Sequence, residues 1–361
     1  MSIFSQDFTI SKTTAPKPKP EPDTLTFGRD FTDHMFVMDY CPEKGWFDGR
    51  IIPYGPICLD PAASALHYGQ ELFEGLKAYR TADNRIQLFR PYKNAERINN
   101  SSERICIPNI DADLFVEAVK ALVDIDRDWI PKKPGTSLYI RPFIFATDPV
   151  LGVRPSDTYK FVVICCPVGS YYNAPVGTLL PTKIFVEQEF VRSVIGGVGF
   201  VKAGGNYAAA LQAQSKAASL GCEQVLWLDA VEHSYVEEIG TSNAFFMIDD
   251  EVITPPLIGT ILPGVTRDSV IALLQKWGVK ITERRLRIEE VTQAAKEGRL
   301  KETFASGTAA VISPVGTLVF ENEEVTVGSG GVGALTQRLY DTIYGIQTGG
   351  LEDDMGWILE V

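Results

Sequence analysis

Histidine is scarce in this chain of 361 residues, which contains only His34, His67 and His233. They lie far apart in the sequence, and their spacing is not typical of a metal site. Zinc hydrolysis and histidine-dependent catalytic triads are therefore disfavoured, and we expect no bound metal. None of the six cysteines forms a C-x-x-C pair. We interpret them as small buried hydrophobic residues in a reducing compartment.

Long hydrophobic runs and long basic runs are also lacking. No apolar stretch reaches the roughly 20 residues that span a bilayer, and the N-terminal residues have no signal-peptide pattern. A formal net charge of −12 disfavours a nucleic-acid or anionic-membrane surface. Hydrophobic residues make up 45% of the chain and charged residues 22%, which is typical of a soluble globular protein. We predict a cytoplasmic location.

The length favours two domains. We predict a small N-terminal α/β domain over residues 1–168, of which residues 1–24 form a loosely ordered arm. Residues 169–181 are rich in Gly, Pro, Tyr and Asn and are expected to connect the domains. Residues 182–361 would form a larger C-terminal domain. The predicted fold class is α+β, with two domains whose mixed sheets are flanked by helices.

Hydrophobic periodicity predicts several of the elements. Apolar runs indicate buried strands over 137–146 and 159–168, and a further strand over 183–191. An amphipathic helix is expected over 112–130, and another helix over 267–277 that ends before Gly278.

Lys202 is set in an unusually glycine-rich stretch. Its neighbours include Gly196, Gly197, Gly199, Gly204 and Gly205. Glycine lets the backbone adopt positive φ and approach a bound group closely, so the lysine could offer its amine to a carbonyl carbon, as pyridoxal phosphate enzymes require. Neither the P-loop nor the dinucleotide pattern fits this stretch. A solvated lysine on a flexible loop is the alternative.

Three other segments could serve the same chemistry. The carboxylates of Glu237 and Glu238 precede an apolar strand, where a carboxylate could hold a pyridine nitrogen protonated. Residues 262–269 lead into a helix whose N-terminus could bind an anion. The small residues of 304–310 could also hold phosphate oxygens. Each segment taken alone is more typical of an ordinary turn, loop or helix start than of a cofactor site.

Together these segments resemble the ordered motifs of branched-chain amino acid aminotransferases, which are fold-type IV pyridoxal phosphate enzymes of the class IV aminotransferase family. The resemblance also includes residues 27–35, 72–78, 88–91 and 221–228, and extends over nearly the whole chain after about residue 24. It implies that residues 182–361 form the domain that binds pyridoxal 5'-phosphate. It further implies a homodimer that transfers the amino group of L-leucine, L-isoleucine or L-valine to 2-oxoglutarate.

The resemblance assigns roles around the cofactor. Lys202 would form the internal aldimine and later move the proton between Cα and C4′. Glu238 would pair with the pyridine nitrogen, and Tyr207 would hydrogen-bond the 3-oxygen of the ring. Arg192 would be a supporting cation. The phosphate would be held by Arg97, the amides of Val265 and Thr266, and Thr308.

The resemblance likewise assigns a substrate pocket. Its walls would comprise Phe31, Tyr68, Phe73, Tyr139, Arg141 and Tyr171. Aromatic walls suit a branched aliphatic side chain, while Arg141 and Tyr68 are the candidates for the second carboxylate of glutamate. Thr241, Ala309 and Ala310 would meet the α-carboxylate.

Two other readings stay open on the sequence. A D-amino acid aminotransferase or an aminodeoxychorismate lyase would share the fold-type IV motifs. A non-enzymatic binding module with a glycine-rich anion loop would belong to a different class.

Overall fold

The computed structural model describes residues 8–169 and 177–361. Two compact units are formed. The first comprises Met1–Asn173, Val201–Gly204 and Ile346–Val361, and the second comprises Ala174–Phe200 and Gly205–Gly345. No helix in the described residues is both long enough and apolar enough to cross a membrane.

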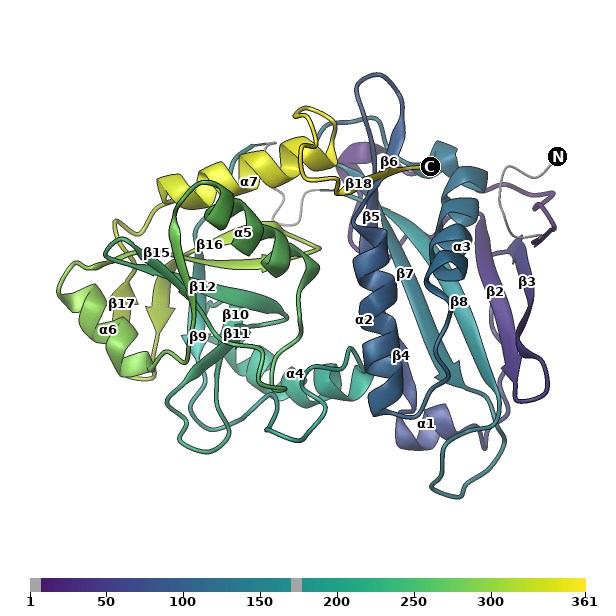
Figure 1. Cartoon of the computed structure of the whole chain (residues 1–361), viewed down its shortest axis with the longest axis horizontal. Helices are drawn as coiled ribbons and strands as arrows, with labels where there is room; N and C mark the ends of the chain where they lie inside the picture. The colour runs from purple at the N-terminus through teal and green to yellow at the C-terminus, as the bar shows by residue number, and fades with distance from the viewer. Residues whose placement is uncertain (1–7, 170–176) are drawn as a thin grey trace. The chain divides into compact units, whose positions relative to one another are not determined.

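The first unit contains a largely antiparallel sheet in the order β1-β3-β2-β8-β7-β5-β6-β18, with β4 pairing to β7. Helices α2 and α3 lie against this sheet (Figure 1). Their apolar residues, such as Ala95, Ile98, Phe115 and Val119, share one core with the sheet residue Phe36. The strands are β1 (Thr9–Ile10), β2 (His34–Cys41), β3 (Gly45–Pro53), β4 (Glu71–Phe73), β5 (Leu76–Arg80), β6 (Ile86–Phe89), β7 (Ser137–Ala146), β8 (Tyr159–Val168) and β18 (Ile358–Glu360), and the helices are α1 (Ser64–Tyr68), α2 (Pro91–Arg104) and α3 (Ala112–Ile125).

The second unit is built on a closed ring of strands. The pairings run from β9 through β10, β11, β12, β15 and β16 and back to β9, which leaves no open edge in this ring. Strand β9 pairs in parallel with both of its neighbours, so the sheet is mixed. The ring strands are β9 (Thr182–Val186), β10 (Gln224–Leu228), β11 (Val236–Ile239), β12 (Ser242–Ile248), β15 (Leu300–Gly307) and β16 (Val311–Val319).

Short strands extend the ring and helices pack on it. Consecutive residues of β9 face different layers. Ile184 packs in the core that includes α6, whereas Phe185 packs against Ala213 and Ala217 of α4. The added strands are β13 (Glu251–Thr254), β14 (Lys280–Glu283) and β17 (Glu324–Thr326), and the helices are α4 (Gly204–Ser219), α5 (Val265–Lys276), α6 (Ile288–Lys296) and α7 (Ala334–Gln347).

The structure differs from the expectations for the N-terminal arm, the C-terminal segment and the cysteines. Residues 8–24 are not a loose arm, since β1 pairs with β3, the Thr13 N–H donates to His34 Nε2 at 3.0 Å and the Lys17 N–H donates to Asp33 at 2.8 Å. The C-terminal strand β18 pairs with β6 of the first sheet rather than joining the second unit. Of the cysteines, Cys58 and Cys106, which lie outside helices and strands, are exposed rather than buried.

Candidate active site

The backbone on both sides of Lys202 is fixed to the first unit. The Phe73 N–H of β4 donates to the Lys202 carbonyl at 3.0 Å, and the Lys202 N–H donates to Ser101 Oγ of α2 at 3.3 Å. Two residues later, the Gly204 N–H donates to Glu71 Oε1 at 2.6 Å. A Cβ at position 204 would lie 2.2 Å from that oxygen, so any other residue there would displace the Glu71 carboxylate. The lysine is therefore not on a flexible loop.

The Lys202 amine shares an aromatic neighbour with an arginine. Lys202 Nζ lies 5.0 Å from the centroid of the Phe73 ring, and Arg141 Cζ lies 4.4 Å from the same centroid. Arg141 donates one hydrogen bond to the Tyr139 hydroxyl at 3.0 Å. Its buried Nε has no hydrogen-bond partner within the described residues. This guanidinium therefore retains a donor for an anionic group.

Arg97 is oriented by a buried carboxylate that the sequence analysis did not single out. Arg97 Nε donates to Glu74 Oε1 at 2.8 Å and Arg97 Nη2 donates to Oε2 at 2.7 Å, a bidentate pair. Asn94 also donates to Oε2 at 2.8 Å. Burial acts to raise the pKa of Glu74, but Arg97, Lys202 and Asn94 together hold it below its ordinary value. Glu74 is thus an ionised carboxylate that interacts with two cations of the predicted site, Arg97 and Lys202.

In the second unit, Glu238 of β11 is held on both carboxylate oxygens. Oε1 accepts hydrogen bonds from Asn243 Nδ2 at 3.0 Å and from the Leu262 N–H at 3.1 Å. Arg192 Nε lies 3.0 Å from Oε2, and both side chains are buried. Arg192 also donates to the carbonyls of Gly199 and Thr260. Glu238 is thus a buried carboxylate held in a fixed orientation by donors on both oxygens.

The start of α5 can bind an anion. Gly264 precedes the helix and supplies no side-chain cap, so the first amides of the helix, those of Val265 and Thr266, meet no capping side chain. A second unsatisfied group lies on β15, where the buried Ser306 Oγ has no hydrogen-bond partner in the described part of the chain. The uncapped N-terminus of this 12-residue helix and the unpartnered Ser306 hydroxyl could both donate hydrogen bonds to a phosphate.

Two tight turns lie at the same edge of the ring. Asn243 at the start of β12 pairs with Ser306 near the end of β15 in antiparallel register. The turn at Gly240-Thr241 precedes β12, and the turn at 308–310 follows β15, so the two turns are neighbours. The register therefore brings together the three residues predicted to meet the α-carboxylate, namely Thr241, Ala309 and Ala310.

Comparison with known proteins identifies the family. Residues 71–318, more than half of the chain, match the family described as Amino-transferase class IV. The chain belongs to this family. It is 55% identical over 359 residues to Branched-chain-amino-acid aminotransferase 2 of Bacillus subtilis (strain 168), covering 99% of this chain and 98% of the relative. The family resemblance predicted from the sequence is thus confirmed.

Solved structures of class IV aminotransferases confirm the fold. The branched-chain amino acid aminotransferase of Escherichia coli superposes with a TM-score of 0.75 at 28% identity, covering 90% of this chain and 98% of that chain. The T.th. branched-chain amino acid aminotransferase with pyridoxamine 5'-phosphate gives a TM-score of 0.74 at 26% identity, covering 90% of this chain and 97% of that one. The predicted fold-type IV α+β architecture is correct.

The remaining predicted residues of this class IV aminotransferase are placed as follows. Phe31 stacks on Tyr54, with centroids 5.0 Å apart, and packs in the cluster that contains Tyr139. Tyr68 is exposed, and its hydroxyl donates to the Leu151 carbonyl. Tyr207 lies in the first turn of α4, Thr308 lies in the turn after β15, and Tyr171 lies outside the described residues.

Sequence reasoning did not single out Glu74 or Asn243, and it included Ser306 only as one of the small residues of 304–310. Each is at least 95% buried. The available signal was a polar residue placed within or beside an apolar strand, because such a residue needs a specific partner when it is buried.

Proposed function

We propose that this protein is a pyridoxal 5'-phosphate-dependent aminotransferase that moves the amino group of L-leucine, L-isoleucine or L-valine to 2-oxoglutarate. The observation that carries the proposal is the 55% identity, over nearly the full length of both chains, to a branched-chain-amino-acid aminotransferase. The contacts around Lys202 and Glu238 agree with it, since one presents a fixed amine and the other a carboxylate ringed by donors.

Each part of the reaction has a candidate residue. When bound, pyridoxal phosphate supplies an aldehyde that condenses with amines and a ring that accepts electrons. Lys202 Nζ takes the proton from the substrate Cα and delivers it to C4′ of the cofactor. The Glu238 carboxylate holds a proton at the ring nitrogen, with Arg192 fixing its orientation. Arg97, the amides of Val265 and Thr266, and Thr308 hold the phosphate, and Tyr207 hydrogen-bonds the ring oxygen.

The side chains of the substrates differ in charge, so one pocket must accept both an apolar side chain and a carboxylate. A leucine side chain needs apolar walls, for which Phe31, Phe73 and Tyr139 are the described candidates. Glutamate and 2-oxoglutarate carry a second carboxylate in the same position. Arg141, with an unused Nε beside Phe73, is the group we assign to that carboxylate.

Replacement of Arg141 by glutamine is expected to separate the two substrates. We expect kcat/KM for glutamate to fall by about 30-fold or more, because a charge-assisted bond is lost from a partly buried site. For leucine, kcat/KM should change by less than about threefold. Steady-state kinetics on both amino donors measure this. An equal loss for both would show that Arg141 supports the pocket rather than recognising the carboxylate.

The overall function is tested with a panel of donors under single-turnover conditions. L-Leucine should convert the yellow cofactor to its amine form, whereas D-alanine and aminodeoxychorismate should react far more slowly. Rapid conversion by D-alanine would favour a D-amino acid aminotransferase, and turnover of aminodeoxychorismate would favour the lyase. A protein that retains no cofactor, and has no activity after cofactor is added, would favour the non-enzymatic binding module.

We also infer that the enzyme acts as a homodimer and in the cytoplasm. The first follows from the family resemblance, and light scattering on the purified protein would test it. The second rests on the composition and charge of the chain.

A further inference from the structure

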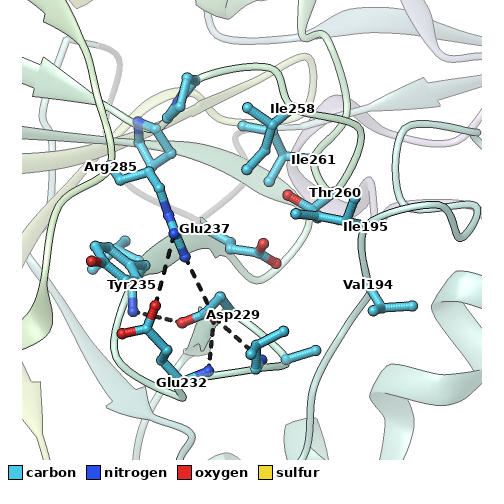
Figure 2. A pocket seen from close by; sticks show the side chains of 15 residues that line it. Val194, Ile195, Asp229, Glu232, Tyr235, Glu237, Ile258, Thr260, Ile261 and Arg285 are labelled. Carbon is cyan, nitrogen blue, oxygen red and sulfur yellow. Dashed lines mark hydrogen bonds and ion pairs between the residues drawn. The ribbon is translucent and has the colours of Figure 1, made fainter.

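A hollow of about 140 Å³ lies within the second unit, beside β11 (Figure 2). It is bounded by the loop at 194–195, the turn at 229–232 between β10 and β11, and the loop at 255–261 before α5. An apolar cavity of about 150 Å³ accommodates a molecule the size of benzene. The hollow is therefore matched to a compact group of about six heavy atoms.

Aliphatic side chains form part of the walls of the hollow and are open to solvent. Four of its lining side chains are unusually exposed for their type, at 48%, 63%, 77% and 43% for Val194, Ile195, Val231 and Ile258. Exposed apolar side chains gathered around a concavity are typical of a binding site rather than of ordinary surface. The walls thus favour an occupant with an aliphatic body.

One buried carboxylate at the hollow, that of Glu237, lacks an oppositely charged partner among the described residues. Figure 2 shows the Glu237 carboxylate directed between Thr260 and Asp229, and the residue is only 5% exposed. Its contacts are a long one to Ser193 Oγ, at 3.5 Å, and the Thr260 side chain. Among the described residues no cation forms an ion pair with it. Burial raises the pKa of Glu237 to about 7, with a contribution from the neighbouring Glu238.

The other charges at the hollow are already satisfied. Asp229 accepts hydrogen bonds from the backbone N–H groups of four residues in its own turn, which lower its pKa to about 2 although burial opposes them. Arg285 lies 3.5 Å from Asp229 and 3.9 Å from Glu232, and it stacks on Tyr235. Glu232 also pairs with Arg287 at 2.8 Å. Of the described charged residues that line the hollow, Glu237 alone lacks a partner of opposite charge at contact distance.

The hollow is separate from the Glu238 side of β11. Consecutive side chains of a strand point to opposite faces, and Glu238 is occupied by Arg192, Asn243 and the Leu262 amide. The two sides share one acceptor, because the Thr260 carbonyl receives hydrogen bonds from Ser193 Oγ on the Glu237 side and from Arg192 on the Glu238 side.

We propose that this hollow is a binding site for a small aliphatic amine, whose ammonium group pairs with Glu237 and whose body contacts Ile195, Ile258 and their neighbours. The ammonium supplies the opposite charge and the donors that the buried carboxylate lacks. The aliphatic body covers the exposed walls. This site is independent of the transamination site and of the proposed function.

The test is a binding titration of the holoenzyme with N-methylpyrrolidine, a cation of six heavy atoms. As a tertiary amine it cannot condense with an aldehyde, so attachment to the cofactor does not confuse the result. We expect saturable binding by ligand-observed NMR, at least about tenfold tighter than that of neutral cyclopentanol. Absence of saturable binding, or equal binding of cyclopentanol, overturns the proposal.

The pH dependence provides a second readout. Glu237 is charged above its pKa and neutral below it, whereas the amine stays cationic throughout. Affinity should therefore rise about tenfold between pH 6 and pH 8. The charged or titratable groups that line the hollow with Glu237 are Asp229, Glu232, Tyr235 and Arg285, and Glu238 and Arg192 act on it electrostatically from the other side of β11. Glu237→Gln should remove the rise in affinity, and a rise that persists in this variant contradicts the assignment.

Matched variants cover the case in which Glu237→Gln disturbs the fold. Ile195→Ser truncates an exposed wall and should weaken binding at least threefold. Leu257→Ser removes another exposed aliphatic side chain, 46% exposed, which belongs to the loop at 255–261 but does not line the hollow, and it should leave affinity unchanged. Equal effects of the two serine variants, or no effect of Ile195→Ser, would place the amine elsewhere on the protein.

Discussion

Lys202→Ala is expected to lower kcat for transamination by at least about 10⁴-fold, because one amine both attaches the cofactor and carries the proton. The backbone contacts to Phe73, Ser101 and Glu71 do not involve the side chain, so the segment should remain in place. Glu74 should likewise keep its bidentate contact with Arg97. We therefore expect the loss to be chemical rather than structural.

The measurement is steady-state transamination with L-leucine and 2-oxoglutarate, accompanied by circular dichroism and thermal unfolding. Borohydride reduction followed by peptide mapping should place the label on Lys202 in the wild type and nowhere in the variant. Lys93→Ala is the matched control, since it removes a half-exposed lysine from an exposed ion pair on α2. A Lys202→Ala enzyme that turns over at the full rate would exclude the assignment.

Secondary structure was predictable where it depends on local pattern. The strands expected over 137–146 and 159–168 have the observed bounds of β7 and β8. The helix expected over 112–130 ends at Ile125 instead, because the Asp126 carboxylate accepts hydrogen bonds from His34, which lies 92 residues away. The strand expected over 183–191 ends at Val186, since the side chain of buried Glu187 accepts the N–H groups of residues 189 and 190.

The residues of the candidate site likewise fall into two groups: those that a local motif identifies, and those that depend on contacts between distant segments. Lys202 and Glu238 were identifiable because a charged residue in a glycine-rich or strand-bounded motif is informative by itself. The partners that orient charged site residues come from other segments, as when Glu74 meets Arg97 or Leu262 meets Glu238. The neighbouring turns at 240–241 and 308–310 depend on the pairing of β12 with β15. Such contacts require strand register, which a single sequence does not specify.

Glu74→Ala is expected to have the largest effect on stability, lowering the free energy of unfolding by about 3–5 kcal/mol. Both partners of the Arg97–Glu74 pair are buried, with side chains 7% and 0% exposed. Removing the carboxylate leaves the guanidinium without its bidentate acceptor in a low-dielectric setting. Urea unfolding followed by circular dichroism measures the change, and a loss below about 1 kcal/mol would contradict the buried-pair argument.

Two controls show whether the stability loss comes from the buried Arg97–Glu74 pair: removal of an exposed glutamate on the same helix, and a change of pH. Glu96→Ala removes an exposed glutamate from the same helix as Arg97, where it pairs with Lys93, and should cost less than about 0.5 kcal/mol. The pKa of Glu74 is lowered in the folded protein, so its contribution is present above the ordinary glutamate pKa of about 4.3 and is lost as pH falls through the folded value. The stability difference between the wild type and Glu74→Gln should therefore shrink in acid. A difference that stays constant from pH 7 down to the acid transition would mean that the carboxylate's charge contributes nothing, and that Glu74 acts through its shape and hydrogen bonds alone.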